Sequence, residues 1–270
     1  MDFEQKTFVL GVGAQKAGTS WLRNYLLERA DIYFAPAEMH FFDSKYGPQT
    51  ARRAERVLTK GSTLRRPANK RLRLKLDYLE RADGGASYKE FFRSRVPADV
   101  AVFGEITPSY ALLGEAGYRA VIDLFPNSKV FFVMRDPAER LYSQVRMNRD
   151  RHQVNADAAV DADRLLRRAK SDQRSSYEMT IQDLDRVFPR DNLLYLFYEK
   201  LFQPSAIERF CSFLGIPYAP ADFDQIVNAG GPRPDIPAEL DKAIRACFER
   251  TYTFCREKFG SELPTEWCCP

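Results

Sequence analysis

The segment Phe8-Val-Leu-Gly-Val-Gly-Ala-Gln-Lys-Ala-Gly-Thr-Ser-Trp-Leu22 has the pattern of a buried strand, a tight turn and the start of a helix. The turn is built from the small residues Gly13, Ala14, Ala17 and Gly18. Such a turn lets backbone N–H groups approach an anion, and Thr19 and Ser20 add hydroxyl donors at the electropositive N-terminus of the helix. Lys16 adds a mobile positive charge. The segment therefore predicts a phosphate-binding loop.

The position of Lys16 separates two kinds of phosphate site. In the nucleoside-triphosphate loop, G-x-x-x-x-G-K-[ST], the lysine follows the second glycine and the next hydroxyl holds magnesium. Here Gly13 and Gly18 have the right separation, but Thr19 stands in the lysine position and Lys16 precedes Gly18. The pattern therefore disfavours a magnesium-dependent triphosphate site. A plain glycine turn with an incidental lysine is the structural alternative.

A second segment, between Lys129 and Ser143, also predicts a strand followed by a helix. Residues 130–134 form a continuous apolar run, as in a strand buried on both faces, and the helix after it starts with proline. Arg135 lies where the strand ends and Ser143 lies two turns into the helix, so both could face one ligand. Taken alone, Arg135 could instead pair with a nearby carboxylate, Asp136 or Glu139, and Ser143 could be solvated.

Together the two segments resemble the nucleotide-binding loops of sulfotransferases that use 3′-phosphoadenosine 5′-phosphosulfate (PAPS). The resemblance implies that the first loop binds the 5′-phosphosulfate through Lys16, Ala17, Gly18, Thr19, Ser20 and Trp21. It implies that Arg135 and Ser143 bind the 3′-phosphate, and that no metal is required. The segment Gly230-Gly-Pro-Arg-Pro234 resembles the family's loop over the nucleotide, which makes Arg233 a further contact; a linker with an idle arginine is the alternative.

The segment Glu38-Met-His-Phe-Phe-Asp43 resembles the acceptor-side motif of carbohydrate sulfotransferases, particularly the heparan-sulfate type. The resemblance implies that Glu38 is the catalytic base, with Lys16 stabilising the leaving phosphate. His40 and Asp43 would then position the acceptor or orient the base, and His40 is the reserve base because the related aryl and steroid enzymes use histidine. Without the neighbouring loops, Glu38 would be interpreted as a solvated carboxylate and His40 as a loop histidine.

Two positions depart from the family pattern. In the segment Gly104–Tyr110 the family commonly has a lysine before Thr-Pro, and here that residue is Ile106; Ala37 likewise replaces a frequent lysine before the glutamate. We therefore expect the acceptor to be a hydroxyl on a sugar or other small molecule. Because of these two departures, the heparan-sulfate specificity of the family members is not carried over to this protein. Two other hypotheses are a nucleoside or sugar kinase with an aberrant loop, and a nucleotide-binding module without catalysis.

The chain is expected to form one α/β domain, residues 1–270, with a central parallel sheet flanked by helices and divergent insertions at about 51–83 and 149–174. The second insertion alternates acidic and basic residues around Leu165 and Leu166 and is expected to form an exposed helix. The expected strands are Phe8–Val12, Val100–Ile106, Val130–Met134 and Leu193–Tyr198. The expected helices are Thr19–Arg29, Glu115–Phe125, Pro137–Asn148, Ser176–Val187 and Pro204–Leu214. In such sheets ligands bind beyond the carboxyl ends of the strands, which is where Lys16 and Arg135 fall.

Composition narrows the class of protein further. The 270 residues carry a net charge of +4, a mild bias toward anionic ligands that is too small to indicate nucleic acid as a partner. The five cysteines lack paired C-x-x-C spacing, so no zinc site is expected and reduced thiols are the default. No signal-like segment or membrane-length apolar run occurs, and the expected location is the cytoplasm. The oligomeric state is not predicted.

Overall fold

The computed structural model describes residues 2–46, 83–151, 161–225, 227 and 236–268. The first expected insertion, at about 51–83, therefore lies almost wholly outside the described residues. The segment around Arg233 lies outside them too.

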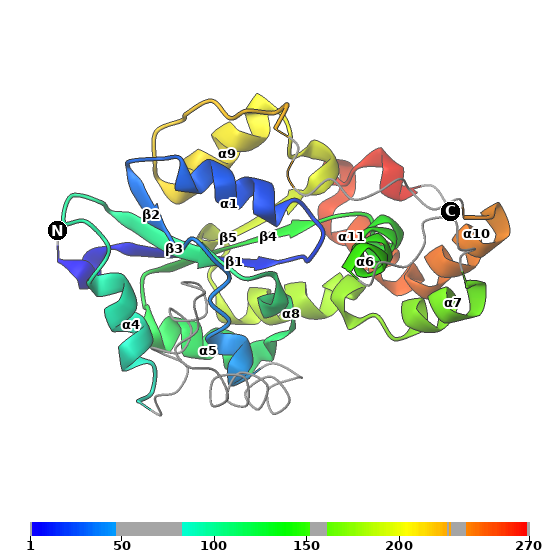
Figure 1. Ribbon diagram of the computed structural model, residues 1–270, viewed down its shortest axis with the longest axis horizontal. Coiled ribbons are helices and arrows are strands. Elements are labelled where there is room, and N and C mark those ends of the chain that lie inside the picture. The colour runs from blue at the N-terminus through cyan, green and yellow to red at the C-terminus, as the bar shows by residue number, and fades with distance from the viewer. Residues whose placement is uncertain (1, 47–82, 152–160, 226, 228–235, 269–270) are drawn as a thin grey trace.

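A five-stranded sheet in the order β2-β3-β1-β4-β5 forms the centre of the molecule, and all its neighbouring strands are parallel. The strands are β1 (Thr7–Gly13), β2 (Ile32–Phe34), β3 (Val102–Ile106), β4 (Ser128–Met134) and β5 (Leu193–Phe197). Because the strands are parallel, their carboxyl ends lie at one edge of the sheet (Figure 1). β1 occupies the middle, between β3 and β4, where a ligand crevice is expected in this topology.

Helices cover both faces of the sheet (Figure 1). One face carries α1 (Thr19–Leu27) and α9 (Pro204–Leu214), and the other carries α4 (Ala86–Arg93), α5 (Gly114–Leu124) and α8 (Tyr177–Val187). The remaining helices lie toward the carboxyl edge: α6 (Pro137–Arg151), α7 (Ala162–Lys170), α10 (Ala238–Cys247) and α11 (Glu249–Phe259). The expected α/β fold class is confirmed.

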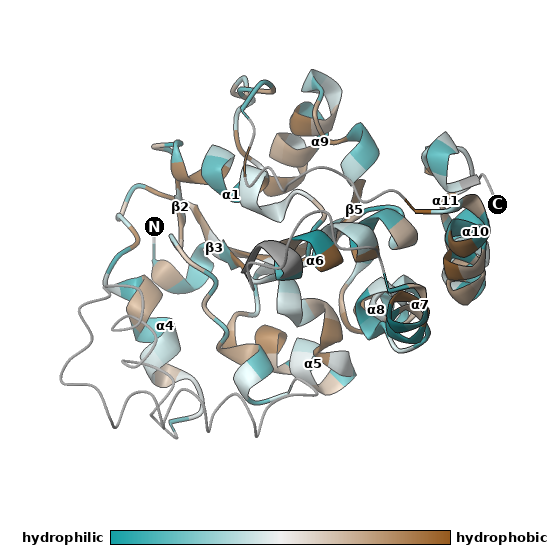
Figure 2. Ribbon diagram, turned by 45° about the vertical axis from the view of Figure 1, so that its right-hand side comes forward, coloured by the Kyte–Doolittle hydropathy of each residue, from teal (hydrophilic) through white to brown (hydrophobic). Residues whose placement is uncertain are grey.

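Burial explains why the strands consist of continuous apolar runs. Residues 8–10 of β1 and 130–134 of β4 have no exposed surface, since helices cover both faces of the sheet. The helices carry both hydrophobic and polar residues (Figure 2), and they bury mainly the hydrophobic ones, as α9 does with Ile207, Phe210 and Leu214. The described residues contain no helix long and apolar enough to cross a bilayer.

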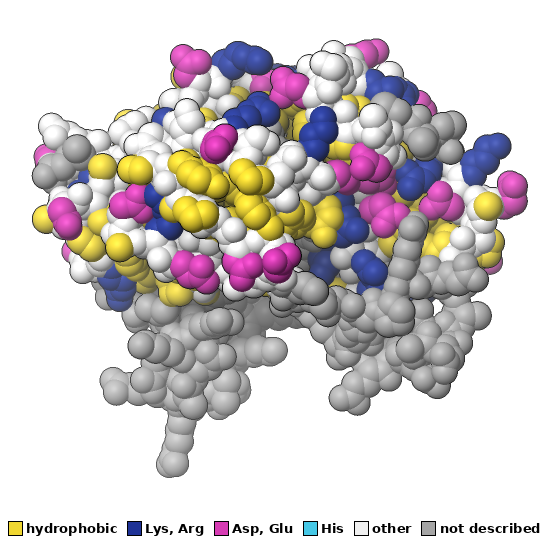
Figure 3. Space-filling model, turned by 90° about the horizontal axis from the view of Figure 1, so that it is seen from above, with side chains coloured by type: hydrophobic (Ala, Val, Ile, Leu, Met, Phe, Trp, Pro, Cys, Tyr) yellow, Lys and Arg dark blue, Asp and Glu magenta, His cyan; other side chains and the backbone are white. Residues whose placement is uncertain are grey.

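On the face over α1 and α9, hydrophobic side chains lie among charges of both signs (Figure 3).

Several elements were not predicted. β2 has only three residues, too few for a periodic pattern, and it joins the sheet through parallel pairing with β3. α4, α10 and α11 were also missed. The second expected insertion, at about 149–174, contains α7, which was expected to be an exposed helix; Leu165 is only 4% exposed because α7 packs against α10. The charged face of α7 is exposed as expected, but its apolar stripe is part of the core.

Two glycines, Gly11 in β1 and Gly104 in β3, allow the central strands to approach closely. Substituting each of them by alanine tests how tightly the surrounding atoms are packed. A Cβ on Gly104 would lie 2.0 Å from the carbonyl oxygen of Val9, whereas a Cβ on Gly11 would meet the side chains of Phe131 and Ile106 at 2.5 and 2.8 Å. Side chains can move and a paired backbone cannot. We expect Gly104→Ala to lower the free energy of unfolding by about 3 kcal/mol or more, and Gly11→Ala by about 1–3 kcal/mol. Urea unfolding of both variants measures this; equal losses would contradict the explanation.

Candidate active site

The loop after β1 has the geometry of an anion site. Gly18 begins α1 with a φ of +82°, and a Cβ there would lie 3.0 Å from Leu201 and 3.1 Å from the ring of Tyr198. Gly18 has no side chain that could cap this helix end, and the N–H groups of Thr19 and Ser20 lie at its electropositive start. Thr19, in the first turn, is only 6% exposed. The loop thus presents backbone donors in a confined space.

Lys16 has a φ of +74° although it is not a glycine. Among the described residues only Lys16 and His40 combine a side chain with a positive φ. Such conformations cost about 1–3 kcal/mol and persist where the surroundings enforce them, often at functional sites. Both residues belong to the set of site residues predicted from the sequence.

Arg135 connects the ends of three strands. It follows β4, its Nη1 donates to the carbonyl of Lys16 at 3.4 Å, and its guanidinium lies 4.5 Å from the ring centroid of Tyr198, just after β5. Its Nη2 also lies 3.7 Å from Glu139, one of the partners considered from the sequence. The structure therefore brings Arg135 to the loop that contains Lys16.

Asp136, the other partner considered, faces the C-terminal helices instead. Its carboxylate pairs with Arg245 of α10 at 2.9 Å and accepts a hydrogen bond from Tyr252 of α11 at 3.1 Å. Its backbone N–H donates to Glu199 at 2.8 Å, and burial raises the pKa of Glu199. These contacts fix the start of α6, on which Ser143 is 8% exposed. No described contact joins Ser143 to Arg135.

A second group of polar side chains lies at the ends of β2 and β3. The imidazole of His40 lies between two carboxylates: Nε2 is 3.0 Å from Glu38, and Nδ1 is 3.1 Å from Asp43. Ser109 lies 3.2 Å from Nδ1 and donates to the same Asp43 oxygen. The side chain of Glu38 is 41% exposed, against 11% for His40 and 4% for Asp43. Glu38 is therefore the most exposed of these three side chains.

The two groups meet at the centre of the sheet. The turn after β3 hydrogen-bonds to β1 through the N–H of Thr107 and the carbonyl of Gly11, at 3.0 Å. A Cβ on Gly13 would lie 3.0 Å from the carbonyl of Pro108, whose next residue is Ser109. The turn that carries Ser109 thus packs directly against the start of the anion loop.

Ile106, the residue in place of the family's lysine, is completely buried. A Cβ on Gly11 would lie 2.8 Å from its side chain, so Ile106 fills the core beneath the loop. No charge is supplied at this position.

Three residues of this region were not predicted from the sequence: Ser109, Tyr198 and Glu105. Ser109 and Glu105 lie in the segment Gly104–Tyr110, where the family pattern concerns the lysine position and gives no role to the other polar groups. Tyr198 follows β5, and its place after a predicted parallel strand was the signal that could have found it.

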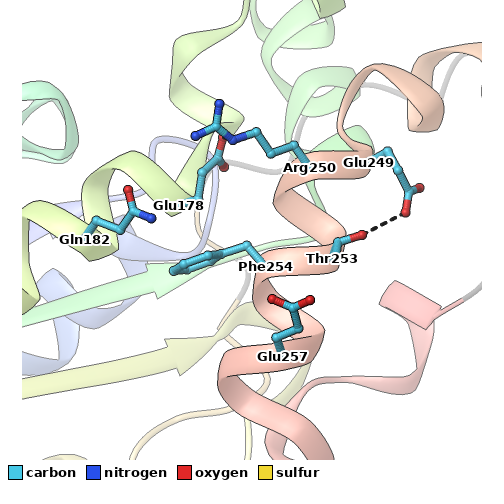
Figure 4. Close-up of a pocket in the computed structure, with 7 residues that line it drawn as sticks. All are labelled: Glu178, Gln182, Glu249, Arg250, Thr253, Phe254 and Glu257. Atoms are coloured by element: carbon cyan, nitrogen blue, oxygen red, sulfur yellow. Dashed lines mark hydrogen bonds and ion pairs between the residues drawn. The ribbon is translucent and has the colours of Figure 1, made fainter.

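A separate pocket of about 340 Å³ lies between α8 and α11 (Figure 4). It is lined by Glu178, Gln182, Glu249, Arg250, Thr253, Phe254 and Glu257. The lining groups bind one another: Thr253 donates to Glu249 at 3.0 Å, and Arg250 lies 3.5 Å from Glu178. None of the strand-end residues lines this pocket. Among the described residues no cluster of three or more side chains could hold a metal ion.

The chain is similar to a known protein family in sequence and to solved structures in fold. A model of the sulfotransferase family matches residues 9–220. A solved sulfotransferase from Alicyclobacillus acidocaldarius aligns with a TM-score of 0.67 at 18% identity, over 97% of this chain and 98% of that one. The sulfotransferase domain of the Synechococcus PCC 7002 olefin synthase gives 0.51 at 18% identity, over 93% and 94%. These structural matches show the fold. No curated protein matches the sequence.

The contact between Tyr198 and Arg135 leads to a binding prediction. We expect Tyr198→Ala to weaken binding of 3′-phosphoadenosine 5′-phosphate about 5- to 30-fold, because the guanidinium loses a cation–π partner worth about 1–2 kcal/mol. Tyr198→Phe keeps the ring and should bind nearly as the parent does. Isothermal titration calorimetry measures both affinities. Equal weakening in the two variants would assign the effect to the hydroxyl instead.

Proposed function

Because the chain belongs to the sulfotransferase family, we propose that it transfers the sulfuryl group of PAPS to an acceptor hydroxyl by in-line displacement. The observation that carries the proposal is the 3.4 Å contact between Arg135 and the carbonyl of Lys16. Lys16 and Arg135, which we propose hold opposite ends of the nucleotide, therefore lie on adjoining loops. We propose that residues 1–270 form one catalytic domain.

The residues after β1 and β4 fit the donor. The uncapped start of α1, with Gly18, Thr19 and Ser20, suits a 5′-phosphate, because its N–H and hydroxyl groups are donors at a positive dipole end. Ala17 is fully buried and Trp21 is 4% exposed, so both shape the loop and its helix from within. Arg135 and Ser143, with Arg233 outside the described residues, are assigned to the 3′-phosphate. PAPS supplies the activated sulfuryl group.

Glu38 is assigned as the base. A neutral imidazole has one N–H and one lone pair, so it cannot donate to carboxylates at both nitrogens. Donation to both Glu38 and Asp43 therefore requires a protonated ring. With the proton on His40, Glu38 is an ionised carboxylate stabilised by the imidazolium, and its side chain is 41% exposed. This arrangement favours Glu38 over His40, whose nitrogens both face partners.

The proposed reaction uses few groups. Glu38 accepts the acceptor's hydroxyl proton as that oxygen forms a bond to sulfur, while the bond from sulfur to the 5′-phosphate oxygen breaks. Lys16 offsets the negative charge that develops on the departing phosphate. Asp43 and Ser109 hold the ring of His40, which keeps Glu38 oriented.

The acceptor is proposed to be a hydroxyl of a carbohydrate or other small molecule. The polar chain from Glu38 to Asp43 supports this, because it can both bind and deprotonate an alcohol. We further propose a cytoplasmic enzyme; the thiols of Cys211, Cys247 and Cys255 form no disulfide among the described residues, which fits a reducing compartment.

Substitution of the two reacting groups tests the mechanism. We expect Lys16→Ala and Glu38→Gln each to lower kcat by about a hundredfold or more, since each removes a positioned charge or base. Glu115→Gln is the matched control, because Glu115 is 39% exposed and lies on α5. Transfer of ³⁵S-sulfate from labelled PAPS to a panel of sugars and small alcohols measures the rates. Full activity of Glu38→Gln would move the base to His40 or elsewhere.

A ligand comparison tests the class of nucleotide. We expect 3′-phosphoadenosine 5′-phosphate to raise the melting temperature more than ADP or AMP does, with no requirement for magnesium. A ligand at a hundred times its Kd stabilises by about 2.7 kcal/mol, which thermal-shift measurements detect readily. A larger shift with ADP that grows with magnesium would favour a kinase. Binding without any sulfated product would favour a module without catalysis.

A further inference from the structure

Glu105 is a carboxylate in β3 with no exposed surface. It accepts hydrogen bonds from four groups: the Tyr88 hydroxyl, the Tyr110 hydroxyl at 2.8 Å, the Thr107 hydroxyl at 2.5 Å and the Met39 backbone N–H at 3.1 Å. Burial raises the pKa of Glu105, and these hydrogen bonds oppose the rise. A buried carboxylate is costly unless its lone pairs are satisfied, and here four donors satisfy them.

These donors connect Glu105 to the loop that carries the proposed base. Met39, between Glu38 and His40, donates directly to Glu105 and also to the Thr107 hydroxyl at 2.9 Å. The Tyr110 hydroxyl accepts from the N–H of Phe41 at 2.9 Å while it donates to Glu105. The backbone on both sides of His40 is therefore attached to one buried carboxylate.

The attachment stabilises an unfavourable backbone conformation, because His40 has a φ of +59°. A side chain in this conformation costs free energy, and the loop keeps it only if its surroundings enforce it. Hydrogen bonds to the N–H groups of Met39 and Phe41 provide that constraint. In this conformation the imidazole meets Glu38 at one nitrogen and Asp43 at the other.

We propose that Glu105 is a positioning residue, which holds the loop of residues 38–43 in the strained conformation that aligns Glu38 for proton transfer. This inference rests on the proposed function, since it assumes that Glu38 is the base. Glu105 itself touches neither acceptor nor nucleotide. It acts on the loop of residues 38–43 through its hydrogen bonds with the N–H of Met39 and with the Tyr110 hydroxyl, which accepts from Phe41. An amide at this position would turn one acceptor into a donor, so Glu105→Gln loses at least one of these links.

Tyr110→Phe cuts one link while keeping the ring and the carboxylate. The matched control is Tyr142→Phe, on α6 and away from the loop. Tyr142 is 1% exposed, against 0% for Tyr110, and its hydroxyl donates to the half-buried Asp241 at the same 2.8 Å. We expect Tyr110→Phe and Glu105→Gln to lower kcat about 10- to 100-fold, with the affinity for 3′-phosphoadenosine 5′-phosphate changed less than twofold. Tyr142→Phe should keep kcat within about twofold at a comparable loss of stability in urea.

The second readout does not depend on activity. The chain has two histidines, so in a His152→Gln background the histidine ring resonances of ¹H–¹³C NMR spectra come from His40 alone. We expect Tyr110→Phe to move these resonances and Tyr142→Phe to leave them in place. Equal effects of Tyr110→Phe and Tyr142→Phe on kcat or on the spectra, or no effect of Tyr110→Phe, would overturn the positioning role. If the parent forms no sulfated product with any acceptor, the proposed function fails, and the NMR comparison still decides whether Glu105 holds the loop.

Discussion

The parallel pairing of β1 with β3 on one side and β4 on the other is the constraint on which the site depends. Parallel pairing places the carboxyl ends of all three strands at one edge, so the residues that follow them must meet. The anion loop follows β1, Arg135 follows β4, and the turn that carries Ser109 follows β3. Each contact at the site, including the one from Arg135 to the carbonyl of Lys16, follows from that register.

The two residues with unfavourable backbone conformations at this edge of the sheet, Lys16 and His40, are both held by hydrogen bonds from neighbouring groups. Lys16 and His40 have backbone conformations that side chains disfavour, and each is held by neighbours from another strand end. Arg135 donates to the carbonyl of Lys16, and Glu105 with its hydroxyl partners holds the backbone around His40. A rigid sheet makes this possible, because the supporting groups are attached to strands that cannot move to relieve the strain.

Charge is distributed unequally between the two halves of the site. The half after β1 and β4 carries Lys16, Arg135 and a helix N-terminus, and it suits an anionic nucleotide. The half after β2 and β3 carries Glu38 and Asp43 with His40 between them, and Ile106 adds apolar packing instead of the family's cation. This difference in charge is consistent with a donor that carries phosphates and an acceptor that must lose a proton.

The sequence alone determined the main strands, the parallel sheet and the residue types at the strand ends, because these depend on local apolar runs, glycine turns and helix starts. It also predicted that Lys16 and Arg135 both follow strands of the sheet, and the structure brings Arg135 to the carbonyl of Lys16. Only the tertiary structure decided the rest: the three-residue β2, the burial of α7, the placement of His40 between two carboxylates, and the attachment of its loop to Glu105. The pairing of β2, the burial of α7 and the attachment to Glu105 arise from contacts between residues far apart in the chain, such as Met39 and Glu105, which leave no periodic pattern in the sequence. Glu38 and Asp43 are close to His40 in the sequence, but the positive φ of His40 that accompanies these contacts could not be predicted from it.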